Sequence, residues 1–261
     1  MELNTYPLVC TRGVVLYPNQ EIVIDVGRDT SVHAVENAQD NYDKKICLFS
    51  QKELEQENPG KEDIYSVGTL CEVRHIRRFD NFLRVKFRGI KRVKLNNWIN
   101  GSLSDLAEVE ILESEKQDAV EEEALIRMIA DELDRMQGQD RFVTKEIVME
   151  ISKGMGGEFL SDKAVQGLPL DIERKQQYLE TLGVNDRLMM LLQDMAKEKK
   201  MSEVEQQINE TVKERIDQGQ KDYYLREKMN VIREELGDTV AQDEDAAKIR
   251  KRLAENPYPD Y

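Results

Sequence analysis

The sequence between residues 187 and 236 constrains the fold more than any other feature. This stretch contains no proline, and its apolar residues recur at spacings of three and four, as on one face of an α-helix. They are Leu188, Leu191, Leu192, Met195, Met201, Val204, Ile208, Val212, Ile216, Leu225, Met229, Ile232 and Leu236. An unbroken helix of about 50 residues is roughly 75 Å long. We therefore predict a long helix that projects from the body of the protein or pairs with another helix.

Gly219 lies in this stretch, where the apolar spacing lapses. Because glycine weakens a helix and often marks a bend, we predict a kink or hinge there.

The first 115 residues favour β-strands. Residues 21–26 and 46–49 are short β-favouring runs, and residues 82–87 alternate in steps of two until Gly89 interrupts the pattern before residues 90–95 resume it. One helix is expected near residues 30–38, with Thr30 or Ser31 as its cap. We therefore predict a small β-rich domain with one inserted helix.

From about residue 116 the apolar period becomes helical, with Leu125, Met128, Ile129 and Leu133 on one face of the first segment. Shorter helical segments follow, up to about residue 182. The predicted fold class is thus α+β. Its parts are a β-rich domain at 1–115, a helical bundle at 116–184, the long coiled-coil-like helix at 185–237 and a linker at 238–261.

Charge and motif content limit the chemistry that the chain can perform. The net charge of −14 is concentrated in residues 101–160, which carry 16 acidic and 6 basic side chains. Three separated cysteines without CxxC spacing and only two histidines argue against a disulfide framework or a zinc site. Phosphate-binding GxxxxGK[ST] and hydrolase GxSxG motifs are both absent. We nominate no catalytic, cofactor-binding or metal-binding residue, and we expect a soluble, cytoplasmic protein.

Several segments together resemble the amino-terminal region of bacterial Lon, the ATP-dependent serine protease family. Residues 12–18 (RGVVLYP) and 26–32 (VGRDTSV) resemble its opening motifs, and residues 63–70 (DIYSVGTL) and 85–93 (VKFRGIKRV) its next two blocks. The most specific match is residues 220–229 (QKDYYLREKM), followed by IREELG at 232–237. The resemblance spans essentially the whole chain in the same order.

The resemblance implies a PUA-like β domain and a helical bundle that recognise misfolded or degron-bearing proteins and help to organise a homo-hexamer. It also implies that the ATPase module, which uses ATP and Mg, and the Ser–Lys protease module would follow in a longer chain, so that this region is not itself an enzyme. Two alternatives stay open: a stand-alone chaperone-like adaptor and a coiled-coil interaction module.

Candidate contact residues for substrate or a neighbouring subunit come from two places. Most of the seven methionines between residues 128 and 195 are expected to fill the bundle core, but the adjacent Met189 and Met190 cannot both face one core stripe. Flexible methionine suits variable apolar partners. On the long helix the apolar surface is wider than a two-position seam requires. Its members are Tyr223, Tyr224, Leu225, Met229 and Ile232.

The segment from Arg74 to Lys94 contains nine basic residues, both ends included, and one acidic residue, Asp80. Because Arg84, Lys86 and Arg88 alternate with Val85 and Phe87, we interpret these cations as the solvent face of a half-buried strand. The net negative charge argues against nucleic acid as a partner, and we expect no membrane contact.

Overall fold

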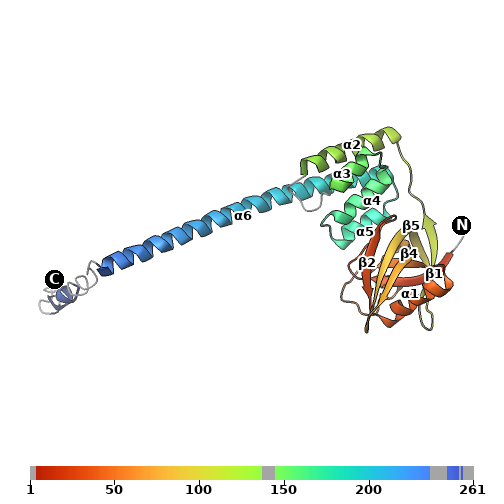
Figure 1. Cartoon of the computed structure of the whole chain (residues 1–261), viewed down its shortest axis with the longest axis horizontal. Helices are drawn as coiled ribbons and strands as arrows, with labels where there is room; N and C mark the ends of the chain where they lie inside the picture. Colours follow the sequence, from red (N-terminus) through yellow and green to blue (C-terminus); the bar gives the residue numbers. More distant parts are fainter. Residues whose placement is uncertain (1–3, 137–144, 236–245, 253, 255–261) are drawn as a thin grey trace, which may run out of the picture. The chain divides into compact units, whose positions relative to one another are not determined.

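The computed structural model describes residues 4–136, 145–235, 246–252 and 254. The chain forms two compact units, Met1–Lys199 and Lys200–Tyr261 (Figure 1). The first unit contains every strand that the described residues form, helices α1 to α5 and the beginning of α6; the second contains the rest of α6. Most of the predicted linker at 238–261 lies outside the described residues, and the domain boundaries remain predictions.

The β-rich part is a six-stranded sheet in the order β2-β5-β4-β3-β1-β6, and an additional pairing of β5 with β6 closes it on itself. β1 and β3 are parallel, whereas the other pairs are antiparallel. The strands are β1 (Asn4–Thr11), β2 (Glu21–Val26), β3 (Lys45–Ser50), β4 (Val67–Arg78), β5 (Leu83–Ile99) and β6 (Leu106–Leu112). A short 3-10 helix, η1 (Lys61–Asp63), precedes β4.

Helix α1 (Asp29–Asn41) covers part of the sheet through Ala34, Val35 and Ala38, which are fully buried. These residues pack in one apolar cluster with Leu48, Val85 and other strand residues. The predicted cap at Thr30 or Ser31 is wrong, because the N-cap residue is Arg28 and its side chain makes no capping hydrogen bond.

Strand β5 continues through Gly89 without a break. Gly89 donates its N–H to the carbonyl of Gln20 and accepts from the N–H of Asn19, both at 2.9 Å. A Cβ atom at this position would collide with the carbonyl of Tyr17. The alternation is interrupted at Gly89 as expected, because the pairing of β5 with β4 shifts register there: Cys71 lies opposite Gly89, and Leu70 lies opposite Lys91. The missing side chain also lets the turn at residues 17–20 cross the strand closely.

In the described part of the chain, helices α2 to α6 follow the sheet and residues 246–252 are also helical, in agreement with the predicted order of a β-rich domain, a bundle and a long helix. The named helices are α2 (Ala119–Met136), α3 (Lys145–Ser152), α4 (Gly157–Gly167), α5 (Ile172–Glu180) and α6 (Val184–Glu235). Asp171 caps α5 by accepting the N–H of Arg174. Helix α6 has 52 residues and is helical through Gly219, so the role of Gly219 as a hinge stays a prediction.

Candidate functional site

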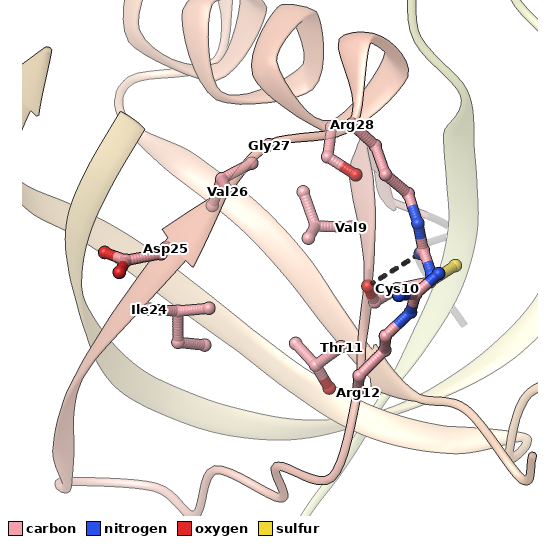
Figure 2. A pocket seen from close by; sticks show the side chains of 10 residues that line it. Val9, Cys10, Thr11, Arg12, Ile24, Asp25, Val26, Gly27 and Arg28 are labelled. Carbon is pink, nitrogen blue, oxygen red and sulfur yellow. Dashed lines mark hydrogen bonds between the residues drawn. The ribbon is translucent and has the colours of Figure 1, made fainter. Parts of the chain in front are cut away.

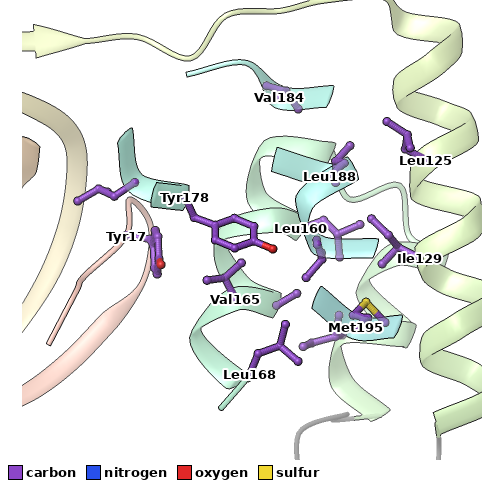
Figure 3. Packing of buried hydrophobic residues seen from close by; sticks show 14 of the residues in the cluster. Tyr17, Leu125, Ile129, Leu160, Val165, Leu168, Tyr178, Val184, Leu188 and Met195 are labelled. Carbon is purple, nitrogen blue, oxygen red and sulfur yellow. The ribbon is translucent and has the colours of Figure 1, made fainter. Parts of the chain in front are cut away.

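The helical bundle and the sheet share one apolar cluster within the first unit. Tyr17 and Val67 from the sheet side join residues of α2 to α6, among them Leu160, Tyr178 and Leu188 (Figure 3). The hydroxyl of Tyr17 donates to the carbonyl of Lys175 at 2.7 Å. The side chain of Gln176 donates to the carbonyl of Val67 at 2.8 Å. The bundle is therefore packed on the sheet by apolar contacts and by hydrogen bonds.

A buried charge cluster reinforces this junction. Arg92 on β5 is 1% exposed and donates through both terminal nitrogens to the carboxylate of Asp162 on α4, at 3.0 and 2.5 Å. Its Nε donates to the carbonyl of Leu179 at 3.1 Å. Our interpretation of the basic segment as a solvent face is thus wrong for Arg92, because helices distant in sequence cover that part of the strand.

Arg187, near the start of α6, is the second buried cation of this cluster. It is fully buried, its Nε lies 3.9 Å from Asp162, and it donates to the carbonyls of Thr181 and Leu182. Burial, followed by the charge of Arg92, lowers the pKa of Arg187 to about 10. Burial raises the pKa of Asp162 and outweighs the attraction of Arg92 and Arg187. Such a cluster fixes a geometry more than it adds stability.

A second polar group joins α5 to α6. The carboxylate of Asp194 accepts from the hydroxyl of Tyr178 and from Nε of Arg174, each at 2.7 Å. Burial raises the pKa of Tyr178, and the hydrogen bond to Asp194 adds to the rise. Sequence reasoning missed Asp162, Arg187 and Asp194, since a charged residue in an amphipathic helix carries no local sign that its partner is buried.

The candidate methionines divide between core and surface. Met189 is 42% exposed, whereas Met190 is partly buried and packs against the shared cluster, so the two side chains lie in different environments as expected. Of the others, Met195 is buried, Met155 packs against the cluster, and Met128 and Met149 are exposed. The side chain of Met136 lies outside the described part. The expectation of a core position therefore fails for Met128 and Met149.

The apolar residues of α6 beyond Lys199 are exposed. Met201, Val204, Ile208, Val212 and Ile216 are 42–56% exposed. Tyr223 and Tyr224, at 70% and 64%, are more exposed still. The remaining candidates are Leu225, Met229 and Ile232, which are also exposed. We call the exposed apolar residues from Met201 to Ile232 the α6 apolar row; its role in binding stays a prediction.

The rest of the basic segment lies at the surface, as interpreted. Arg84 forms a bidentate ion pair with Asp25 at 2.7 Å, and Lys86 pairs with Glu21 at the same distance. Arg78 and Lys91 pair with Glu36 and Glu113. These cations are therefore largely neutralised by carboxylates from neighbouring segments.

Reactive and ligating groups are sparse in the part of the chain that the structure describes. Burial raises the pKa of each thiol, to about 12 for Cys10, so these cysteines are protonated at neutral pH. No group of three or more His, Cys, Asp or Glu side chains in the described ranges is arranged to hold a metal ion. Among those residues, none of the helices combines the length and the apolar character that a bilayer crossing requires.

Comparison with known proteins agrees with this architecture. Residues 5–197 match the family model of the ATP-dependent protease La (LON) substrate-binding domain. The chain is 32% identical to the Lon protease of Brevibacillus choshinensis over 97% of its length. It is 30% identical to Lon protease 1 of Bacillus subtilis over 99% of its length. It spans about a third of the length of these relatives, 33% of each.

Two solved structures share the fold of the first part of the chain. The N-terminal domain of Mycobacterium avium complex Lon protease superposes with a TM-score of 0.60 at 19% identity, over 74% of this chain and 98% of that one. A Lon N-terminal domain protein from Xanthomonas campestris superposes with a TM-score of 0.52 at 16% identity, over 72% of this chain and 97% of that one. Because the family model matches most of the chain and the fold agrees, the chain belongs to the Lon substrate-binding domain family.

Proposed function

We propose that this chain is the substrate-recognition and assembly region of a Lon protease that degrades misfolded and degron-bearing proteins with the use of ATP. In this proposal the ATPase and Ser–Lys protease modules belong to a longer chain, and ATP and Mg bind there. The protein works in the cytoplasm as a homo-hexamer. The region described above contributes binding and no chemical step.

The α6 apolar row carries the proposal. Most of the stability of helices in proteins comes from packing of an apolar face against a partner, and each fully buried large apolar side chain contributes about 1.5–3 kcal/mol. The exposed row from Met201 to Ile232 therefore favours a partner that covers it, either an unfolded polypeptide or the same helix of a neighbouring subunit. Met189 offers a further adaptable contact on the first unit.

The test is to change Tyr224 and Met229 together to serine in the full-length protease. We expect degradation of an unfolded substrate such as casein to fall about fivefold or more, or the hexamer to dissociate, because truncation of an anchor residue costs upward of about 1 kcal/mol of binding. Degradation rates and the sedimentation profile are the measurements.

A matched control changes Asp222 and Arg226 to serine. Both residues are exposed on the same helix, and the double change also leaves the net charge unaltered. This variant should behave like the wild type. If the Tyr224 and Met229 variant degrades casein at the wild-type rate and keeps its size, the apolar row has no role in substrate binding or assembly.

The coiled-coil alternative makes a different prediction about assembly. If α6 alone accounts for self-association, deletion of residues 1–180 leaves the oligomer intact. If substrate recognition involves the first unit, the same deletion removes binding of unfolded protein.

A further inference from the structure

The closed sheet has a gap in its hydrogen bonding between β1 and β2. β2 and β6 lie end to end along the same edge of β5. β2 pairs with residues 83–88 of β5, and β6 pairs with residues 92–99. β1 pairs with β6 through residues 4–7, and the N–H of Leu8 donates to the carbonyl of Asp105 at 3.0 Å on the same edge. Residues 8–11 of β1 pair with β3 on their other side, and the described strands contain no pairing between β1 and β2. Both strands therefore present an open edge.

A pocket of about 320 Å³ lies at this gap (Figure 2). Its apolar lining includes Val9, Ile24 and Val26. Gly27, Arg28 and Ser31, at the beginning of α1, also line it, and Figure 2 shows α1 lying across the pocket where β2 ends. An extended chain entering between the strands would have to stop at α1.

Arg12 and Arg28 converge at the pocket. The Nη2 atom of each lies 3.2 Å from one acceptor, the main-chain carbonyl oxygen of Gln56. The buried side chain of Gln51 donates to the same oxygen at 3.0 Å and accepts from Arg28 at 2.7 Å. Three donors, two of them cationic, thus share a single neutral oxygen. A carbonyl has two lone pairs, so this arrangement suits an anionic oxygen better.

Neither arginine is neutralised by a carboxylate contact. No ion pair among the described residues includes Arg12 or Arg28, and Asp25, which also lines the pocket, is held by Arg84. The charge of Glu57 acts on Arg28 without an ion pair. Burial and the charge of Arg12 lower the pKa of Arg28, which is consistent with two cations held together without an anion.

Arg28 also donates to the main-chain carbonyl of Cys10 at 3.4 Å. This bond places a free-edge carbonyl of β1 beside the guanidinium pair. An extended peptide could therefore pair with the strand edge and offer its terminal carboxylate to the arginines at the same time.

We propose that this pocket binds the C-terminal carboxylate of an extended polypeptide, with Arg12 and Arg28 donating to the carboxylate and the preceding residues lying along the open strand edges. The inference rests on the proposed function and names one class of substrate segment. A free phosphate would use the arginines but neither the strand edges nor the apolar lining. An internal Asp or Glu side chain would require the chain to continue past α1.

The experiment measures peptide binding to the full 261-residue chain by fluorescence anisotropy. The probe is a ten-residue uncharged, apolar-rich peptide labelled at its amino terminus, with either a free carboxylate or an amide at its C-terminus. We expect the amide to bind about tenfold more weakly, because a charge-assisted hydrogen bond contributes upward of about 1.4 kcal/mol, which is tenfold in Kd. Two further ligands test the other anion sources. A peptide with a C-terminal amide and one internal Asp tests a side-chain carboxylate, and inorganic phosphate, added as a competitor, tests a free anion.

The Arg12→Gln variant should bind both peptides with the affinity of the amide. Arg12 is exposed and makes one hydrogen bond to Gln56 among the described residues, so the fold should survive, which a thermal melt checks. Arg28→Lys, which keeps the charge but loses the planar fork, should reduce the difference between the peptides. Arg88→Gln removes an exposed arginine outside the pocket and should leave the difference unchanged.

Equal affinity of the acid and amide peptides overturns the carboxylate site while leaving the proposed function intact. An Asp-containing amide that binds as tightly as the free acid, or a phosphate that displaces the peptide at equal concentration, also overturns it. If neither peptide nor unfolded casein binds the chain, both this inference and the proposed function fail.

Discussion

Helix α6 shows one apolar pattern with two outcomes. Before Lys199, Leu188, Leu191 and Met195 are buried to 1% exposure or less. After Lys199, Val204, Ile208 and Val212 keep the same spacing and are 42–56% exposed. The periodicity therefore defines an apolar face, and the presence of α2, α4 and α5 beside the first part alone decides which portion of that face is covered.

The charged residues of α6 divide in the same way. Arg187 and Asp194 are buried and bonded to partners on α4 and α5, whereas Arg215, Asp222 and Arg226 lie exposed. A buried charge needs partners in fixed positions, and an exposed one is satisfied by water. The first part of α6 is therefore part of the core of its unit, and the apolar and charged residues of the second part are exposed.

The largest effect is expected when Asp162, the carboxylate that Arg92 and Arg187 share, is removed. Asp162→Asn should lower the free energy of unfolding by about 3–5 kcal/mol, because it removes the buried countercharge of two guanidiniums and leaves only the half-exposed Glu158, 3.9 Å from Arg92. Urea denaturation at pH 7 measures the change. As a control, Glu123→Gln breaks an exposed pair with Arg127 and should have no measurable effect. A small effect of Asp162→Asn would mean that the junction does not depend on this cluster.

A second test compares one truncation on each part of the helix. Leu191→Ala should lower the free energy of unfolding of the first unit by about 2–5 kcal/mol, because it leaves a cavity in the shared core. Ile208→Ala, at a position 56% exposed, should change it by less than about 0.5 kcal/mol. Both are measured by urea denaturation. If Ile208→Ala is as destabilising as Leu191→Ala, the second part of α6 is covered in solution.

The smallest effect is expected at the border between the two parts. Glu132 on α2 accepts from Lys199 at 2.8 Å, and this hydrogen bond lowers the pKa of Glu132. A lowered carboxyl pKa stabilises the fold above its unfolded value of about 4.3, and this contribution disappears as the pH falls through the folded value. Glu132→Gln should therefore lower the free energy of unfolding by less than about 1 kcal/mol at pH 7.

The pH dependence supplies the control for that variant. The difference in stability between the wild type and Glu132→Gln should shrink as the pH falls below about 4.3 and vanish below the lowered folded pKa of Glu132. Denaturation curves at pH 7 and at a series of acidic pH values measure both proteins. A difference that does not decrease with falling pH would show that the glutamine disturbs packing rather than removing an ion pair.

Much of the fold follows from local patterns. The predicted helix at 187–236 agrees with α6 at Val184–Glu235 within a few residues, because apolar spacing and the absence of proline are local properties. The alternation around Val85 and Phe87 likewise placed β5. Gly89 interrupts the alternation as expected, through a shift in the register between β4 and β5. The turn that pairs with Gly89, some 70 residues away in the chain, was not visible in the pattern.

The candidate contact residues were predictable only in part. The width of the apolar surface around Tyr223 and Tyr224 is visible in the sequence, and both residues are exposed. The convergence of Arg12, Arg28 and Gln51 on one oxygen had no counterpart in the sequence pattern, since the three lie on different segments that only the closed sheet brings together.

The sequence by itself determined the order of sheet and helices, the length of α6 and the apolar face of that helix, because these depend on residues close together in the chain. Only the tertiary structure decided which part of that face is buried, why Arg92 differs from Arg84 and Arg88 on the same strand, and where β1 and β2 leave a gap. The physical reason is that burial and charge pairing depend on what packs against a residue, and the residues that do so here lie up to about 160 positions away.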